Sequence, residues 1–301
     1  MLPPKQRPKA ALAIDKIQQL ADAACLLDGL RESPSPSPVL LFKRILAFPK
    51  SEGVVLDKRG AKRYPVGARY PLKAKITLVA RDGEGHPMPA GKSAPMDWGG
   101  QLVDFSESGA NIRLHPAAIA APDEVCTLKL ELDHMLFETE GTVTSFQMQS
   151  QYVTCGLSLN FPDKHTRKAY QQLMAPVVVG STLEAITDLV KQDLPGLVKE
   201  QYHGEADGVL STWREGSGKG LKLFEFLLHD YCIRGNSELP GLKIGYRDGA
   251  KVGSRDSAPA IPVPLSREHQ AEVTKLYRFV VQNLTKSVPS ETRKFLEIFA
   301  A

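Results

Sequence analysis

The middle third of the chain alternates apolar and polar residues with a period of two. In its first segment the apolar positions are Leu72, Ala74, Ile76, Leu78 and Ala80. Such alternation predicts a strand with one buried face. Further strands are predicted at residues 101–105, 110–114, 126–132, 135–146 and 153–161. Several short strands at close spacing, followed by a helix from Asp163 to Met174, indicate a small closed barrel or a sandwich.

The residues before this region form an expected N-terminal appendage. Residues 10–31 place their leucines largely on one face, which predicts an amphipathic helix. The alternating Ser and Pro residues at 33–38 predict a stiff spacer. Residues 1–55 hold too little apolar surface to be stable alone. We therefore divide the chain into an appendage (1–55), a barrel (56–176) and a C-terminal region (177–301).

The C-terminal region shows a mixed pattern. A helix is predicted from Thr182 to Tyr202, interrupted near Pro195. Strands are predicted at 209–214, 221–234 and 242–247, although 221–228 also suits a helix. Ser266 is a suitable N-cap for a long helix to about residue 287, and Ser290 for a short final one. The expected fold class is α+β, with a mixed, mainly helical accessory domain of unknown type at the C-terminus.

Composition narrows the classes of protein that fit. The chain has 301 residues, 42% of them hydrophobic and 24% charged, which is ordinary for a globular protein with room for about two domains. No apolar run approaches the ~18 residues of a membrane span, and no secretory signal is recognisable. The four cysteines form no CxxC pair, so neither a zinc site nor a disulfide framework is expected. We expect a cytoplasmic protein.

Positive charge is concentrated just before the first barrel strand, although the net charge is only +4. Residues 57–75 contain a single acidic residue, Asp57. Their basic residues are Lys58, Arg59, Lys62, Arg63, Arg69, Lys73 and Lys75. A basic run is usually a solvated face. The functional alternative is a site for phosphate or nucleic acid.

The sequence from Asp104 to Gly109 predicts a tight turn between two strands. Asp104 and Ser106 can bond to neighbouring backbone groups, and Gly109 tolerates a positive φ. Alone, such a turn is typical of a simple connector. Upstream, Arg59 and Arg63 stand four residues apart, and arginine suits both a phosphodiester and a guanine edge.

Taken together with the last strand (Cys155-Gly-Leu-Ser-Leu-Asn-Phe161), these motifs make residues 57–176 resemble the PilZ domain. Members of that family are six-stranded antiparallel β-barrels that act as bacterial receptors for cyclic di-GMP. The RxxxR signature matches Arg59 and Arg63, and the [D/N]xSxxG signature matches Asp104, Ser106 and Gly109. The resemblance implies that these two arginines hold guanine edges and phosphates, while the turn residues hold the other side of the ligand. Arg69 is a rival for the second arginine and a candidate accessory phosphate contact.

The resemblance implies a non-enzymatic cyclic di-GMP receptor that changes conformation on binding and regulates an unidentified protein partner. Motility, pilus and exopolysaccharide machinery are the partners it suggests. No cofactor, metal or DNA is expected, and the chain has no GxSxG, HExxH or CxxC motif. One alternative is a PilZ-like interaction adaptor that does not bind nucleotide. Another is a nucleic-acid-binding barrel, which the scarcity of aromatic residues in the basic run disfavours.

Overall fold

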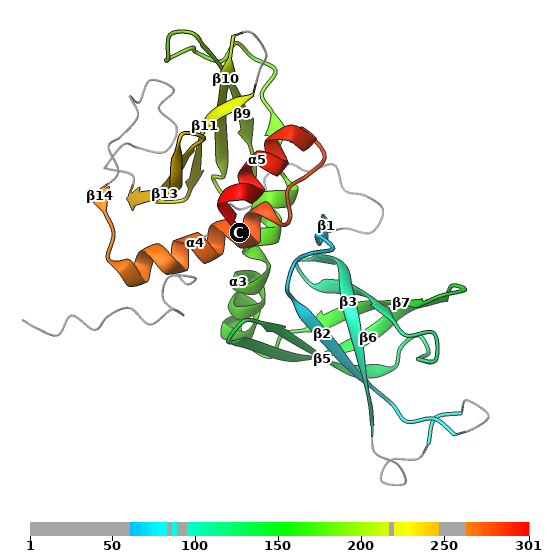
Figure 1. The fold of residues 1–301 in the computed structure, drawn as a ribbon. Coiled ribbons are helices and arrows are strands. Elements are labelled where there is room, and N and C mark those ends of the chain that lie inside the picture. Colours follow the sequence, from blue (N-terminus) through cyan, green and yellow to red (C-terminus); the bar gives the residue numbers. More distant parts are fainter. Residues whose placement is uncertain (1–60, 83–85, 89–94, 217–219, 247–262, 301) are drawn as a thin grey trace, which may run out of the picture. The chain divides into compact units, whose positions relative to one another are not determined.

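The computed structural model describes residues 61–82, 86–88, 95–216, 220–246 and 263–300 (Figure 1). The predicted N-terminal helix, the Ser/Pro spacer and Arg59 lie outside these residues. Within them, the strands form two separate antiparallel sheets. No helix in the described part of the chain is long and apolar enough to cross a membrane.

The first sheet is a closed barrel. Its strands are β2 (Lys73–Leu78), β3 (Met96–Ser106), β4 (Gly109–Leu114), β5 (Val125–Leu132), β6 (Met135–Met148) and β7 (Val153–Asn160). They pair in the order β3-β2-β5-β6-β7-β4, and the additional β3–β4 pairing closes the ring. A short seventh strand, β1 (Tyr64–Pro65), pairs with β3. The six-stranded antiparallel barrel expected from the sequence is therefore confirmed.

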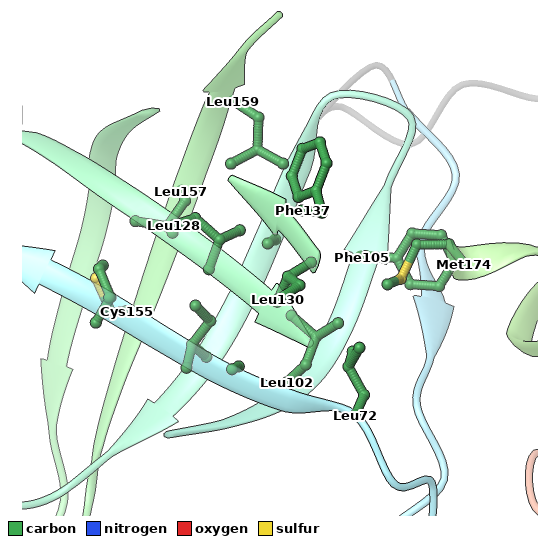
Figure 2. Close-up of a cluster of buried hydrophobic side chains, with 14 of the residues drawn as sticks. Leu72, Leu102, Phe105, Leu128, Leu130, Phe137, Cys155, Leu157, Leu159 and Met174 are labelled. Atoms are coloured by element: carbon green, nitrogen blue, oxygen red, sulfur yellow. The ribbon is translucent and has the colours of Figure 1, made fainter. Parts of the chain in front are cut away.

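The barrel strands follow the predicted alternation closely. In β2, Ala74, Ile76 and Leu78 are buried, whereas Lys73 and Lys75 face the solvent. Inward side chains from strands on all sides of the barrel meet in one core (Figure 2). Cys126 and Cys155 belong to this core. One boundary differs: β3 begins at Met96, five residues before the predicted start of this strand at residue 101.

Helix α3 (Lys164–Ser181) closes the barrel. It begins at the N-cap Asp163, whose carboxylate accepts a hydrogen bond from the Thr166 amide. Tyr170 and Met174 pack into the barrel core. The helix passes Pro176 and runs beyond the predicted end at Met174, because the apolar residues that follow the proline, Val177 to Val179, are buried.

The C-terminal module, residues 184–300, is mainly strand rather than mainly helix. Its strands are β8 (Glu184–Ala185), β9 (Leu197–His203), β10 (Val209–Glu215), β11 (Leu221–Leu228), β12 (Tyr231–Asn236), β13 (Leu239–Tyr246) and β14 (Val263–Pro264). Each pairs with its sequence neighbour in one antiparallel sheet. Helices α4 (Arg267–Val281) and α5 (Ser290–Ala300) follow. The expected N-cap at Ser266 is confirmed.

The helix predicted from Thr182 to Tyr202 is wrong. This segment instead forms β8, a connecting loop and β9. The side chains of Lys199, Glu200 and Gln201 favour a helix in isolation, but β9 pairs with β10 along its whole length. Tertiary pairing therefore overrides local propensity here.

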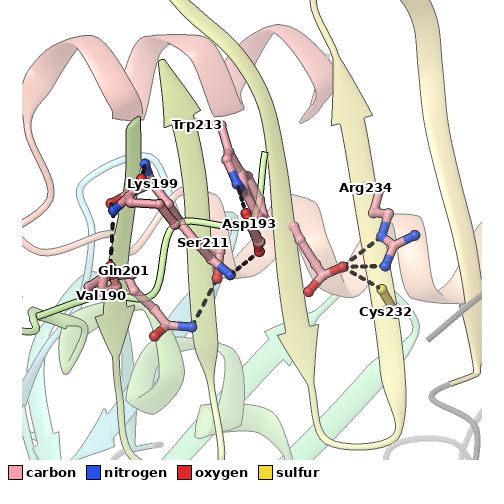
Figure 3. A network of polar contacts seen from close by, with 10 residues as sticks. Val190, Asp193, Lys199, Gln201, Ser211, Trp213, Cys232 and Arg234 are labelled. Atoms are coloured by element: carbon pink, nitrogen blue, oxygen red, sulfur yellow. Dashed lines mark hydrogen bonds and ion pairs between the residues drawn. The ribbon is translucent and has the colours of Figure 1, made fainter. Parts of the chain in front are cut away.

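The two faces of the C-terminal sheet differ in character. On one face Phe224 stacks on Tyr277 of α4 and lies edge-on to Phe295 and Phe299 of α5. On the other face a polar row crosses the strands, because Gln201, Ser211, Glu225 and Arg234 occupy paired positions (Figure 3). In this row Arg234 donates to Glu225 at 2.6 Å.

Candidate ligand-binding site at the β3–β4 hairpin

The turn predicted at Asp104–Gly109 is present and tight. Ser106 at the end of β3 pairs directly with Gly109 at the start of β4, which leaves Glu107 and Ser108 as the two turn residues. The Ser108 carbonyl accepts a hydrogen bond from the Leu159 amide of β7 at 2.8 Å. The turn is thus fixed to a third strand as well as to its own hairpin.

Gly109 is required by close packing, not by a positive φ. Its φ lies outside the left-handed region, so the conformational reason predicted from the sequence is wrong. A Cβ at this position would lie 2.8 Å from the Leu157 carbonyl oxygen and 3.1 Å from Ser106 Oγ. The Gly109 carbonyl in turn accepts a hydrogen bond from the Tyr170 hydroxyl at 3.0 Å. The absence of a side chain at Gly109 thus allows β4 to approach β7 closely.

Asp104 is held by two side chains. Arg63 Nη1 donates to Asp104 Oδ1 at 2.5 Å, and Asn111 Nδ2 donates to Oδ2 at 3.1 Å. Asn111 is the cross-strand partner of Asp104 on β4. The register of the hairpin shifts between Leu102 and Asp104, and such irregularities re-aim side chains near functional sites. The carboxylate therefore has a defined orientation beside the arginine.

The arginine reaches this position through a short segment that we call the arginine arm, residues 61–66. Its strand β1 extends the edge of β3, where Tyr64 pairs with Phe105 and Pro65 with Asp104. The Val66 amide adds a hydrogen bond to the Val103 carbonyl at 2.9 Å. Strand β1 was not predicted from the sequence, yet its pairing brings Arg63 next to the hairpin turn.

The paired groups remain partly accessible to solvent. The side chain of Arg63 is 38% exposed and that of Asp104 is 21% exposed. Ser106 is almost fully buried. Beside the arm lies a hollow of about 350 Å³, and its lining residues are Lys62, Arg63, Tyr64, Pro65, Ser181, Thr182, Glu184, His203, Gly204 and Glu205.

Arg69, the rival for the second arginine, lies in a different environment. Its side chain is 82% exposed, and Nη1 lies 3.8 Å from Glu297 Oε1 of helix α5. Of the two candidates, Arg63 is the one beside Asp104. The first arginine of the motif, Arg59, is outside the described residues.

Sequence reasoning missed one contributor from the C-terminal module. Glu205 belongs to none of the motifs singled out in the sequence, but it accepts a hydrogen bond from the Tyr64 hydroxyl at 2.7 Å and forms an ion pair with Lys62. Glu205 is more than 140 positions from both residues, and no local pattern marks it. Asn111, which bonds to Asp104, was not predicted either. Its position, the second residue after Gly109, is the only feature of the sequence that connects it with the turn.

The basic run is neutralised by acidic partners in the described residues. The pairs are Lys62–Glu205, Arg63–Asp104, Arg69–Glu297, Lys73–Glu131 and Lys75–Asp97. Tyr70, one of the two aromatic residues in the run, is buried and donates its hydroxyl to the Leu173 carbonyl. This arrangement disfavours a nucleic-acid-binding surface with stacking aromatic residues.

Cysteine and metal chemistry gain little support. Burial raises the pKa of Cys126 to about 11, and that of Cys155 and Cys232 to about 12, so these thiols stay protonated near neutral pH. Among the described side chains, no three His, Cys, Asp or Glu residues gather as a metal site.

Comparison with known proteins addresses the family of the barrel. The PilZ domain from Escherichia coli YcgR with c-di-GMP is similar at 10% identity and a TM-score of 0.30, covering 40% of this chain and 92% of that chain. Borreliella burgdorferi PlzA in complex with c-di-GMP is similar at 11% identity and a TM-score of 0.26, covering 66% and 86%. A search of the curated proteins finds no match. The model of the PilZ domain matches residues 57–175, which confirms the resemblance seen in the motifs: this part of the chain is a PilZ domain.

Proposed function

We propose that this protein is a receptor for cyclic di-GMP, which binds at the β3–β4 hairpin between Asp104 and the arginine arm. The observation that carries the proposal is the 2.5 Å pairing of Arg63 with Asp104, because it joins the two sequence motifs at one place on the barrel surface. The match of residues 57–175 to the PilZ domain supports the same ligand.

The chemistry of the site suits this ligand. Cyclic di-GMP presents two guanine edges and two phosphodiester charges. A guanidinium can donate two parallel hydrogen bonds to guanine O6 and N7 or to phosphate oxygens. Arg63 donates from Nη1 to Asp104, and the other N–H groups of its guanidinium can make such contacts. The Asp104 carboxylate can accept from the N–H groups of guanine, and Arg59 supplies a second guanidinium from the preceding segment.

The proposed role is regulatory and needs no catalytic step. Bound nucleotide would hold the arm against the hairpin and so favour one arrangement of the chain over another. The energy for this shift is the difference in affinity for the two arrangements. A protein partner would recognise the arrangement that the bound nucleotide favours. Motility, pilus and exopolysaccharide machinery are the candidates that the family suggests.

Calorimetric titration with cyclic di-GMP tests the proposal. The native protein should give saturable heat at micromolar ligand. Arg69→Ala should bind within about twofold of the native protein, because Arg69 lies away from Asp104. Absence of heat at tens of micromolar ligand would contradict the proposal and favour the interaction adaptor that does not bind nucleotide.

A further inference from the structure

The arginine arm is held from two sides. Successive side chains of an extended segment point in opposite directions. Accordingly, Arg63 contacts Asp104 of the barrel, whereas its neighbours Lys62 and Tyr64 both contact Glu205 of the C-terminal module. The two oxygens of Glu205 are divided between them, with Oε1 facing Lys62 and Oε2 facing Tyr64.

Glu205 is itself anchored to the helix that holds the hairpin turn. Its amide donates to Thr182 Oγ1 at 2.9 Å, and Thr182, the C-cap of α3, donates to the Val178 carbonyl at 2.7 Å. Near the other end of the same helix, Tyr170 bonds to Gly109. Helix α3 therefore connects Glu205 with the hairpin that carries Asp104.

Tyr64 is well suited to a lasting contact with Glu205. Burial raises the pKa of Tyr64 well above its ordinary value, and the hydrogen bond and charge of Glu205 raise it further. The hydroxyl is then a neutral donor throughout the physiological pH range. Lys62 lies 5.6 Å from the centre of the Tyr64 ring, which adds a cation–π contact to the same cluster.

We propose that Glu205 is a positioning residue for the nucleotide site. By holding Lys62 and Tyr64, it fixes the arm so that Arg63, between them, faces Asp104. Ordering a flexible side chain before the ligand arrives reduces the entropy lost on binding. The inference rests on the proposed function, and it means that the site is incomplete without a residue outside the PilZ domain.

Glu205→Gln in the full chain tests this positioning role. We expect cyclic di-GMP binding to weaken between about twofold and tenfold, and Tyr64→Phe to weaken it by a smaller factor. The matched control is Glu184→Gln. Glu184 lines the same hollow, but no hydrogen bond or ion pair joins it to the described residues of the arm. Equal effects of the two Glu→Gln changes would show that only the charge of the hollow matters and would overturn the inference.

Introducing Glu205→Gln into an Arg63→Ala background distinguishes a positioning role from a general disturbance of the structure. If Glu205 acts through Arg63, then Glu205→Gln should cause no further loss of binding when Arg63 is absent. An undiminished loss in that background would overturn the inference. Should Glu205→Gln fail to fold, Tyr64→Phe provides the same comparison.

A readout without ligand keeps this inference distinct from the proposed function. In protein labelled with ¹⁵N-arginine, the Arg63 guanidinium signals should show restricted rotation in the native chain and lose it in Glu205→Gln. That result without binding of cyclic di-GMP would support positioning and contradict the proposed function. Conversely, if the native protein binds cyclic di-GMP and Glu205→Gln binds it equally well, the proposed function is supported and the positioning role is contradicted.

Discussion

The two walls of the candidate site are held in different ways. The hairpin wall belongs to the barrel: β4 pairs on one side with β3 and on the other with β7, and Tyr170 bonds to its first residue. The arm wall contains a strand of only two residues, and partly exposed side chains complete its attachment. One wall is fixed by buried backbone, and the other by a few polar contacts.

This difference suggests that the hairpin wall and the arm wall have different roles. A rigid turn can present Asp104 in a constant geometry, since moving it would disturb three strands and a helix. The arm can move at a smaller cost, because exposed ion pairs each contribute little to stability. Changes in the arm should therefore alter affinity, whereas changes in the packing around the hairpin should alter folding.

The largest effect is expected from Arg63→Ala. It should weaken cyclic di-GMP binding by at least about 2 kcal/mol, roughly thirtyfold, because a charge-assisted bidentate contact is lost. Its effect on unfolding should stay below about 1 kcal/mol, as expected for a partly exposed ion pair. Calorimetry and urea unfolding measure the two quantities. Unchanged affinity would remove Arg63 from the site.

Gly109→Ala should reverse this pattern. The new methyl group would meet the Leu157 carbonyl oxygen, and we expect a loss of between about 1 and 2 kcal/mol in the free energy of unfolding. The control is Gly99→Ala in β3, where a Cβ has open space and φ is not left-handed. Similar urea midpoints for the two variants would contradict the packing role of Gly109.

Tyr170→Phe probes how helix α3 holds the turn. Loss of the hydroxyl that bonds to the Gly109 carbonyl should cost about 1 kcal/mol of unfolding free energy. Tyr152→Phe serves as a control for the loss of a hydroxyl, since Tyr152 contacts Arg113 through its ring. Thermal unfolding should separate the two variants. A Tyr170→Phe protein as stable as the control would show that the turn does not need the helix.

The smallest effect concerns a surface contact between the barrel and helix α4. The hydrogen bond from Lys275, followed by those from His134, lowers the pKa of Asp133 to about 2. A lowered pKa means that the stabilising contribution is present above the ordinary carboxyl pKa of about 4 and is lost as pH falls through about 2. Asp133→Asn should remove this part of the acid dependence, by less than about 1 kcal/mol. An unchanged acid unfolding curve would show that the contact contributes nothing.

The barrel could be predicted because each strand buries one face. The alternation at Ala74, Ile76 and Leu78 fixes which side faces the core, whatever the partner strand is. The C-terminal strand β9 lacks this signal. Among Lys199, Glu200, Gln201 and Tyr202, only Tyr202 is buried, so its strand character depends on pairing with β10.

The site could be predicted only in part, because some of its contacts form only between segments that are distant in the sequence. Asp104 and Gly109 belong to one short motif, and the structure places Arg63 beside them. The physical reason for Gly109 lies in Leu157, on another strand. Glu205 approaches the arm only after both sheets have formed, so no spacing in the sequence marks it.

Hydrogen–deuterium exchange with and without cyclic di-GMP tests the central claim most directly. We expect saturating ligand to increase protection in peptides covering residues 61–66 and 104–111, and to leave strands β11 to β13 unchanged. Protection confined to the C-terminal sheet, or none at either wall while the ligand is bound, would contradict a nucleotide site formed by Arg63 and the β3–β4 hairpin.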